Sequence, residues 1–434
     1  MATFLSLGGS QEVGRNCFSV EADDSIILLD MGFHLEQFLS LSEDEFPSSK
    51  NHSLRRFMSG GALPDIRILR NKRKQVEAII CSHAHLDHIA AIPFLIKKFR
   101  CPIYATPFTA KVIRSLCQEK HIDPDIVEIL PGETFKLKNF DVEFIQIAHS
   151  TPQTVAVALH TSEGIILYAN DYKEDNAPPF EDKTDISRLS EFSGRTKALI
   201  VDSLYSPSDD FCKSESYARE KVLDLKSDLS SHRAIFASTF SSHIHRLHSL
   251  VDLAHSLNRE IVFVGRSLCR YIESAKDANI IDLSSQGMLL KYTRQVSSFF
   301  KKQFDPRKYF FIVTGHQGEP NAVLSRLADG LFNFSEDDAV IFSCNIIPVP
   351  ISLKNRSILE SKLIKNNLTI YRDIHVSGHA HAKDHRKLIS LLKPEFVFPV
   401  HGTIRMQDAM VDLAKKEGVK NVFSLKVGES CHFE

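Results

Sequence analysis

The sequence predicts an α/β fold, arranged either as two domains or as one large domain that carries an insertion. The chain has 434 residues, which is more than one hydrophobic core of ordinary size usually holds. Short strand-like runs separated by turn residues fill the first part, up to about Asp202. After Asp202 helical and strand patterns alternate, which is typical of a parallel sheet covered by helices.

The overall composition is that of a soluble globular protein. Hydrophobic residues make up 43% of the chain and charged residues 25%. No apolar run is long enough to span a membrane, and the eight cysteines are scattered without a CxxC pair. We therefore expect a cytoplasmic protein with reduced thiols. Because the formal net charge is only -1, a nucleic acid would have to be bound by a local basic surface.

The first third of the chain is predicted to form a meander, a long loop, a strand and a helix. Apolar runs within residues 3–30, separated by glycine and aspartate pairs, predict short antiparallel strands. Residues 39–65 show no clear periodicity and predict a long loop. Residues 76–81 predict a buried strand, and 89–99 predict a helix by their apolar spacing.

In the rest of the chain, helices are predicted from apolar residues at helical spacing, and strands from short apolar runs bounded by turn residues. The helices expected after Asp202 are 214–229, 243–257, one near 322, one near 358, 383–392 and 405–416. The further strands expected are 102–105, 142–148, 154–160, 164–169, 198–202, 234–238, 261–264, 310–314, 339–343 and the segment EFVFPVH that ends at His401.

A histidine-rich turn follows the strand predicted at 76–81. Residues 82–88 read SHAHLDH and place His83, His85, Asp87 and His88 at a junction between a strand and a helix. Imidazole and carboxylate groups are the ligands that suit zinc or a similar divalent ion at neutral pH. The alternative is a polar helix cap with exposed histidines. The density of potential ligands in this turn favours a metal site, in which one turn supplies ligands to two ions.

Three further candidate ligands stand at the ends of other predicted strands. His149 follows FIQIA, Asp171 follows IILYAN, and His401 follows FVFPV. A single histidine at a strand end is more often an ordinary surface residue. Together with the SHAHLDH turn, however, the three residues supply the additional ligands that two ions need. We assign Asp171 as the bridging carboxylate.

Longer motifs resemble those of the ribonuclease J family, especially its archaeal members, among the β-CASP nucleases of the metallo-β-lactamase superfamily. The resemblance is carried by LGGSQEVGRNCF near the start, VTGHQGEPNAVLSRLA at 313–328, HVSGHA at 375–380 and KPEFVFPVHGTIRM at 393–406. It spans nearly the whole chain. The five metal motifs of the superfamily match at Asp30, His83 to His88, His149, Asp171 and His401.

The resemblance implies a specific fold and domain order. An αββα metallo-β-lactamase sandwich would be formed by residues 1–205 and 375–434, interrupted by an α/β β-CASP domain with a parallel sheet at 206–374. The change of pattern after Asp202 agrees with this boundary.

The same resemblance implies how the ligands are shared between two divalent ions, which we expect to be zinc, with manganese as the alternative. His83, His85 and His149 would hold one ion, Asp87, His88 and His401 would hold the other, and Asp171 would bridge them. Asp30 would hydrogen-bond a ligand histidine rather than bind metal.

The resemblance also implies two catalytic residues besides the ligand Asp87. Asp202 would orient His379, and His379 would donate a proton to the leaving oxygen. Two divalent ions would lower the pKa of a shared water and neutralise the phosphate. The chain departs from bacterial members at Ala380, where they carry glycine, and in ending at Glu434 without their C-terminal domain. A dimer built through such a domain is therefore in doubt, and a homodimer through another surface stays open.

The expected substrate is single-stranded RNA, shortened processively from a 5′-monophosphate end with release of nucleoside 5′-monophosphates. Endonucleolytic cutting is a second mode. Glycine turns and an arginine suit a phosphate pocket, although each segment alone is more often an ordinary turn or cap. The candidates for this pocket are Ser242, His243, Arg266, Ser267, Ser377, Gly378 and His379.

Other interpretations of the sequence remain open. The basic cluster RILRNKRK at 67–74 is either an RNA guide or a solvated charged face. A thioester or lactam hydrolase of the same superfamily would need neither the insertion nor His379. An endonuclease of the archaeal cleavage-factor type would carry RNA-binding KH modules before its nuclease domain. A catalytically inactive scaffold subunit would lack metal ligands, and this chain keeps them.

Overall fold

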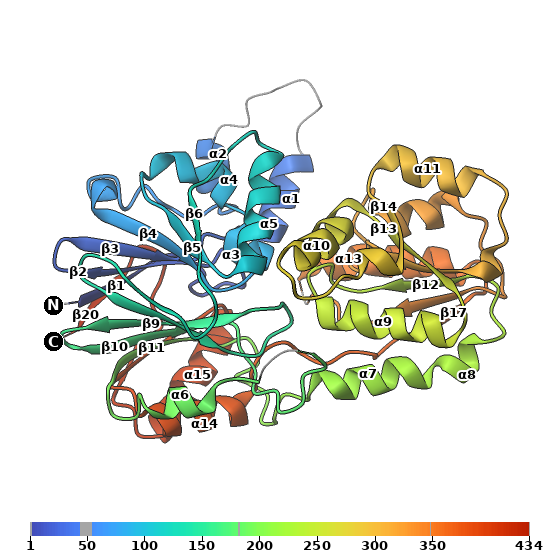
Figure 1. Cartoon of the computed structure of the whole chain (residues 1–434). Coiled ribbons are helices and arrows are strands. Elements are labelled where there is room, and N and C mark those ends of the chain that lie inside the picture. Colours follow the sequence, from blue (N-terminus) through green and yellow to red (C-terminus); the bar gives the residue numbers. More distant parts are fainter. Residues whose placement is uncertain (1, 44–53, 181–182, 348, 434) are drawn as a thin grey trace. The chain divides into compact units, whose positions relative to one another are not determined.

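The computed structural model describes the chain apart from residues 1, 44–53, 181–182, 348 and 434. It divides into two compact units (Figure 1). The first unit contains Met1–Cys212 and Ser377–Glu434, and the second contains Lys213–Val376. The sequence predicts these junctions after residues 205 and 374. No described helix combines the length and the hydropathy that crossing a bilayer requires.

The first unit begins with a seven-stranded sheet. Its strands are antiparallel from β20 to β3 and parallel from β3 to β6. The meander predicted for residues 3–30 is therefore confirmed. In spatial order the strands are β20 (Ser430–Phe433), β1 (Ala2–Gly8), β2 (Cys17–Ala22), β3 (Ser25–Leu29), β4 (Val76–Cys81), β5 (Ile103–Ala105) and β6 (Ile126–Glu128).

A second seven-stranded sheet packs face to face on the first. Phe4 of the first sheet and Phe398 of the second lie 4.8 Å apart between ring centroids, and Phe18 and Tyr168 lie 6.0 Å apart. The second sheet has the order β19 (Asn421–Val422), β18 (Phe396–Val400), β11 (Thr196–Asp202), β10 (Gly164–Ala169), β9 (Val155–Thr161), β8 (Asp141–Gln146) and β7 (Thr134–Lys136).

Helices cover both outer faces of this sandwich, which confirms the predicted αββα architecture (Figure 1). The helices on the side of the first sheet are α1 (Leu35–Glu43), α2 (Leu54–Ser59), α3 (Leu86–Ile89), α4 (Ile92–Leu95), the short 3₁₀ turn η2 (Ile96–Lys98) and α5 (Pro107–Gln118). Helices α6 (Ile186–Ser190), α14 (Ala382–Leu392) and α15 (Ile404–Lys416) cover the second sheet and share its outer core cluster.

Two sequence predictions in the first unit are wrong in detail. The helix expected at 89–99 is broken into α3, α4 and η2, because the chain restarts at Ile92 with Pro93 in the first turn of the new helix. The loop expected at 39–65 contains the end of α1 and all of α2 in its described part. Residues 44–53 of that loop lie outside the described residues.

The second unit is built on one parallel sheet, as the alternation of helices and strands predicts. All its strand pairs are parallel. Its strands, in spatial order, are β14 (Gly287–Leu290), β13 (Glu260–Val264), β15 (Tyr309–Val313), β12 (Ile235–Ser238), β16 (Ala339–Phe342) and β17 (Thr369–Tyr371). Its α-helices are α7 (Glu215–Asp224), α8 (Lys226–Leu229), α9 (Ile244–Ser256), α10 (Arg266–Asp277), α11 (Thr293–Lys301), α12 (Val323–Arg326) and α13 (Pro350–Ile364).

A buried ion pair ties together several elements of the second unit. The Arg246 guanidinium donates to both carboxylate oxygens of Glu215, at 2.7 and 3.0 Å. It also donates to the carbonyl oxygens of Ser343 and Ile374, each at 2.9 Å. Burial would raise the pKa of Glu215, but Arg246 and His243 outweigh it and hold the pKa well below its ordinary value. The ion pair therefore stabilises the folded second unit at pH values above the ordinary glutamate pKa. This stabilisation is lost as the pH falls toward the lowered pKa of Glu215.

Replacing Glu215 with alanine should destabilise the second unit by about 3–5 kcal/mol, because Arg246 would be left buried without its counterion. Urea unfolding followed by circular dichroism measures this loss. The matched control is Asp252→Ala, which breaks a partly exposed pair with Arg219 and should cost less than about 1 kcal/mol. Equal losses in the two variants would contradict the assignment.

Candidate metal centre

The candidate ligands gather at one edge of the sandwich because strands from both sheets end there. The turn 82–88 follows β4 of the first sheet. In the second sheet β10, β11 and β18 run parallel, and Asp202 is in register with Val400, so their carboxyl ends share one edge. Asp171 follows the end of β10 after one residue, and His401 follows the end of β18 directly. The strand topology thus brings together side chains that are far apart in the sequence.

The first set of ligands surrounds one oxygen of Asp171. His83 Nε2 lies 3.5 Å and His149 Nε2 lies 3.6 Å from Asp171 Oδ2. His85 Nδ1 lies 3.2 Å from His149 Nε2. The ligand atoms of His83, His85, His149 and Asp171 all lie within 4.8 Å of one another. This is the set that the resemblance assigns to one ion.

The second set also adjoins Asp171. His88 Nε2 is 3.3 Å from Asp171 Oδ2 and 3.8 Å from Asp87 Oδ2. His401 faces Asp87 Oδ2 with Nδ1 at 3.8 Å and Asp171 Oδ1 with Nε2 at 4.0 Å. The ligand atoms of Asp87, His88 and His401 also fall within 4.8 Å of one another. Histidines of both sets therefore lie within 4.0 Å of Asp171, the residue predicted to be the bridging carboxylate.

Hydrogen bonds behind the histidines hold their rings with one nitrogen facing the cluster. His88 Nδ1 donates to Asp30 Oδ2 at 2.7 Å, and His149 Nδ1 donates to the Gly378 carbonyl at 2.6 Å. His85 Nε2 lies 3.1 Å from the hydroxyl of Ser150. Such partners select the tautomer of a ligating histidine. Asp30 thus contacts His88, a candidate ligand histidine, and this contact is the one expected from the sequence.

The chemistry of the cluster fits divalent metal ions. His83 Nε2 and Asp171 Oδ1 are buried and have no hydrogen-bond partner in the structure, as ligand atoms reserved for an ion would be. Burial holds the pKa of His83 and of His149 well below the ordinary value, so both rings offer neutral lone pairs. Burial would raise the pKa of Asp171, yet nearby histidines hold it well below its usual range as a carboxylate.

The backbone at the site is strained or closely packed. Asp30 and His401 adopt left-handed φ angles of 60° and 51°, which side-chain-bearing residues rarely do. Gly32 passes so close to the metal-ligand turn that a Cβ there would lie 1.5 Å from the backbone oxygen of Asp87. Only glycine fits this position.

A histidine–aspartate pair adjoins the two ligand sets. His379 Nδ1 lies 2.8 Å from Asp202 Oδ2, and His379 Nε2 lies 4.0 Å from Asp171 Oδ2. Burial lowers the pKa of His379, but Asp202 and Asp171 outweigh it and raise the pKa to about 9. Asp202 is fully buried, whereas His379 remains partly exposed. The pair therefore presents a protonated imidazole beside the cluster.

The phosphate-pocket candidates lie in both units. Ser377 and Gly378 belong to the first unit, next to His379 and His149. In the second unit, Arg266 and Ser267 begin α10 directly after β13, and Ser242 and His243 follow β12. The Ser267 hydroxyl is 3.0 Å from that of Ser241. His243 Nε2 is buried 3.3 Å from Glu215 Oε2, so this ring belongs to the ion pair described above.

The basic cluster 67–74 lies far from the ligands along the fold. It precedes β4, whereas the metal-ligand turn follows β4, so the two stand at opposite ends of that strand. Arg67 pairs with Asp65 at 2.7 Å and Lys72 with Glu21 at 2.7 Å. Both of these pairs are partly exposed to solvent.

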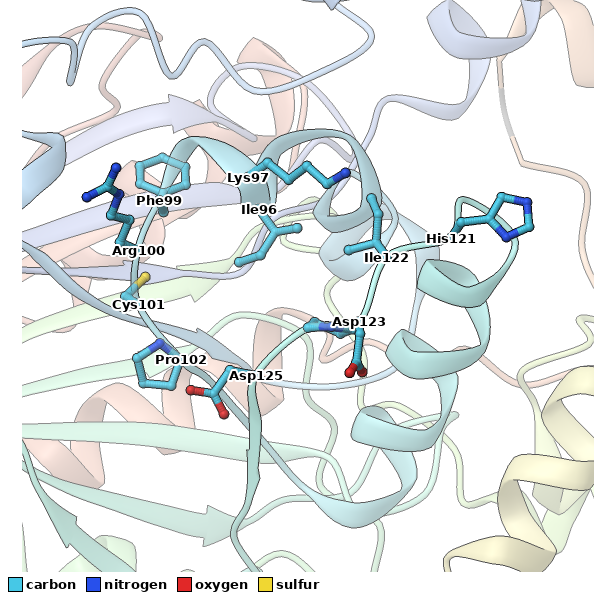
Figure 2. Close-up of a pocket in the computed structure, with 11 residues that line it drawn as sticks. Ile96, Lys97, Phe99, Arg100, Cys101, Pro102, His121, Ile122, Asp123 and Asp125 are labelled. Atoms are coloured by element: carbon cyan, nitrogen blue, oxygen red, sulfur yellow. The ribbon is translucent and has the colours of Figure 1, made fainter.

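A surface cavity of about 380 Å³ is also separate from the ligand cluster. It is lined by residues 96–97, 99–102 and 121–125 (Figure 2). Pro102 and Cys101 lead into the start of β5, beside the amino end of β4. The cavity therefore lies at the end of the sheet opposite His83 and has no part in the metal centre.

Comparisons with known proteins agree with this geometry. The model of the metallo-beta-lactamase superfamily matches residues 11–228, that of the "Ribonuclease J, beta-CASP domain" matches 231–359, and that of the "Zn-dependent metallo-hydrolase RNA specificity domain" matches 365–424. A crystal structure of a protein of unknown function from Enterococcus faecalis shares the fold, with a TM-score of 0.67, 15% identity and 99% coverage of both chains.

The fold and the ligand cluster define a metallo-β-lactamase superfamily protein with a β-CASP domain. Ribonuclease J of Pyrococcus abyssi is 37% identical over 99% of this chain and 96% of the relative. Ribonuclease J of Methanocaldococcus jannaschii is 35% identical over 99% of this chain and 98% of the relative. The chain belongs to the ribonuclease J family.

Proposed function

We propose that this protein is a metal-dependent ribonuclease that degrades single-stranded RNA processively from the 5′ end. It prefers a 5′-monophosphate end and releases nucleoside 5′-monophosphates, with endonucleolytic cutting as a second mode. One observation carries the proposal: the complete set of seven candidate ligands stands beside the His379–Asp202 pair, in a chain of the ribonuclease J family. A scaffold subunit without activity would have no use for this set.

Two divalent ions fit the residues present. His83, His85 and His149 would hold one ion, Asp87, His88 and His401 the other, and Asp171 both. Bound ions would supply positive charge opposite the phosphate and a water of lowered pKa for attack on phosphorus. Nitrogen and carboxylate ligands favour zinc, with manganese as the alternative.

The protein's own groups perform the proton transfer on the leaving side. His379 is held by Asp202 through Nδ1, which leaves Nε2 free to donate a proton to the departing oxygen. With a pKa of about 9 the ring carries that proton at neutral pH. The Asp202 carboxylate keeps the His379 ring oriented and stabilises the positive charge of its protonated form.

Each unit separately offers candidate residues for recognition of the 5′-terminal phosphate. Ser377 and Gly378 adjoin the catalytic histidine, and the start of α10 presents backbone N–H groups with Arg266 and Ser267. Helix amino termini and arginine side chains bind phosphate well. Ser242 and His243 are further candidates in the second unit, and His243 contacts Glu215 there.

The cellular setting is part of the same proposal. All eight cysteines, each within the described residues, are free thiols, which supports a reducing compartment such as the cytoplasm. RNA decay and maturation would be the processes served.

An RNA labelled at a 5′-monophosphate end tests the proposal. Incubated with the protein and zinc or manganese, it should release labelled mononucleotide from the first time point. A matched 5′-hydroxyl RNA should be degraded more slowly. Label that appears only in longer fragments would assign endonucleolytic cutting instead. Faster hydrolysis of a thioester than of RNA would contradict the proposal.

A further inference from the structure

One buried carboxylate behind the ligand cluster accepts four hydrogen bonds. Ser82 donates its backbone N–H to Asp30 Oδ1 at 2.7 Å and its hydroxyl to Oδ2 at 2.8 Å. His88 Nδ1 lies 2.7 Å from Oδ2, and the Tyr168 hydroxyl donates to Oδ2 at 2.6 Å. Asp30, His88 and Tyr168 are fully buried and Ser82 is 2% exposed. These bonds are therefore shielded from solvent and strong.

This network reaches one histidine of each ligand set. The Ser82 hydroxyl lies 3.0 Å from His83 Nδ1. Since that hydroxyl gives its own hydrogen to Asp30, it accepts the hydrogen of His83 Nδ1. His83 then carries no hydrogen at Nε2. His88 gives its Nδ1 hydrogen to Asp30, and its Nε2 accepts a hydrogen bond from Asn16 Nδ2 at 2.9 Å. Asp30 thus fixes the tautomer of His83 in the first set and of His88 in the second.

Tyr168 connects Asp30 to the opposite sheet. Asp30 follows β3 in the first sheet, and Tyr168 lies in β10 of the second, near the end of the strand that leads to Asp171. The phenol oxygen accepts a hydrogen bond from Asn170 Nδ2 at 2.9 Å. Burial and then the charge of Asp30 raise the pKa of Tyr168 well above its ordinary value, so the hydroxyl keeps its hydrogen. Within the described part of the chain, the acceptor of that hydrogen is the shared Asp30 oxygen.

We propose that Tyr168 is a positioning residue for the metal centre, which acts through Asp30 and Ser82 on His83 and His88 and so couples the affinities of both ligand sets for their ions. The proposal rests on the metal-dependent function proposed above. The Tyr168 phenol contacts neither ligand set directly, yet in this proposal it helps to orient histidines of both sets.

The variant Tyr168→Phe tests the proposal because it removes one oxygen and keeps the ring in the core. The matched control is Tyr172→Phe, which removes another buried phenol whose hydroxyl lies 3.0 Å from His385 Nδ1. Zinc affinity is measured by competition with a chromophoric chelator, and bound zinc per chain by elemental analysis. Tyr168→Phe should lower the affinity for both ions about 10–100-fold, as loss of a group that orients ligands typically does. Tyr172→Phe should leave both affinities unchanged.

Wild-type protein that binds neither zinc nor manganese would overturn the proposed metal centre itself. If the wild type binds two ions, unchanged affinity in Tyr168→Phe overturns only the positioning role. Equal weakening in Tyr172→Phe, or weakening of one ion alone, also overturns it. Should Tyr168→Phe fail to fold by circular dichroism, Ser82→Ala takes its place, with the expected loss largest for the ion held by His83.

Discussion

Replacing Asp87 with alanine should lower the rate of RNA cleavage by at least about a thousandfold, because an ion at a phosphate centre contributes several kcal/mol to the transition state. Asp87 is the one carboxylate that belongs to the second set alone, 3.8 Å from both His88 Nε2 and His401 Nδ1. Its side chain is partly exposed, so the fold should survive the change. Single-turnover cleavage of end-labelled RNA, together with the zinc content of the variant, measures the effect.

The zinc content should fall from two ions per chain toward one, since the first ligand set is untouched. Asp125→Ala serves as the control, because Asp125 lines the cavity of Figure 2, at the other end of the sheet. That variant should cleave RNA and bind zinc as the wild type does. Cleavage that persists in Asp87→Ala would show that the active site lies elsewhere.

The second large effect is expected from His379→Ala, which should slow cleavage by about 10²–10⁴-fold, the usual contribution of a general acid. His379 is held by Asp202 at 2.8 Å and carries its proton at neutral pH, with a pKa of about 9. In our assignment it is no metal ligand. The variant should therefore cleave RNA more slowly while it keeps both ions. Zinc analysis together with single-turnover kinetics distinguishes a loss of catalysis from a loss of metal.

Asp202→Asn is the companion variant for this prediction. It keeps the shape of the side chain and removes the charge that raises the pKa of His379. We expect a loss of rate smaller than that of His379→Ala, with zinc content unchanged. Loss of zinc in His379→Ala would make that residue a ligand and would contradict the assignment.

The fold class and the candidate ligands could be predicted because their signals are local. Strand-like runs, turn residues and the change of pattern after Asp202 are visible within short windows. Asp171 and His401 each stand just after such a run, and parallel strands in one sheet share their carboxyl edge. A ligand at a strand end is therefore predictable even when its partners are far away in the sequence.

The partners behind the ligands could not be predicted, because they depend on contacts between sheets. Tyr168 reads as an ordinary buried residue of a strand, and only the packing of β10 against the first sheet brings it to Asp30. Ser82 stood inside the SHAHLDH motif but carries no ligand chemistry of its own. The left-handed backbone of Asp30 and His401 is also hard to predict, because Asp and His adopt it more often than most residues but still rarely.

Some helices were missed or misplaced for different reasons. The spacing of Leu268, Tyr271, Ile272 and Ala275 is helical and would have predicted α10, but the preceding Gly265 resembles a turn. At 86–98 the apolar spacing continues across a break, so periodicity alone predicts one helix where the chain forms three short turns. Tertiary packing of the ligand turn decides the outcome there.

The central claim is that seven side chains from distant parts of the chain hold two metal ions that RNA cleavage requires. Elemental analysis of protein purified without chelator tests it most directly, combined with cleavage assays before and after metal removal. Two zinc or manganese ions per chain, with activity lost on chelation and restored by the metal, is the predicted result. A protein that contains no transition metal and gains no activity on adding one would contradict it.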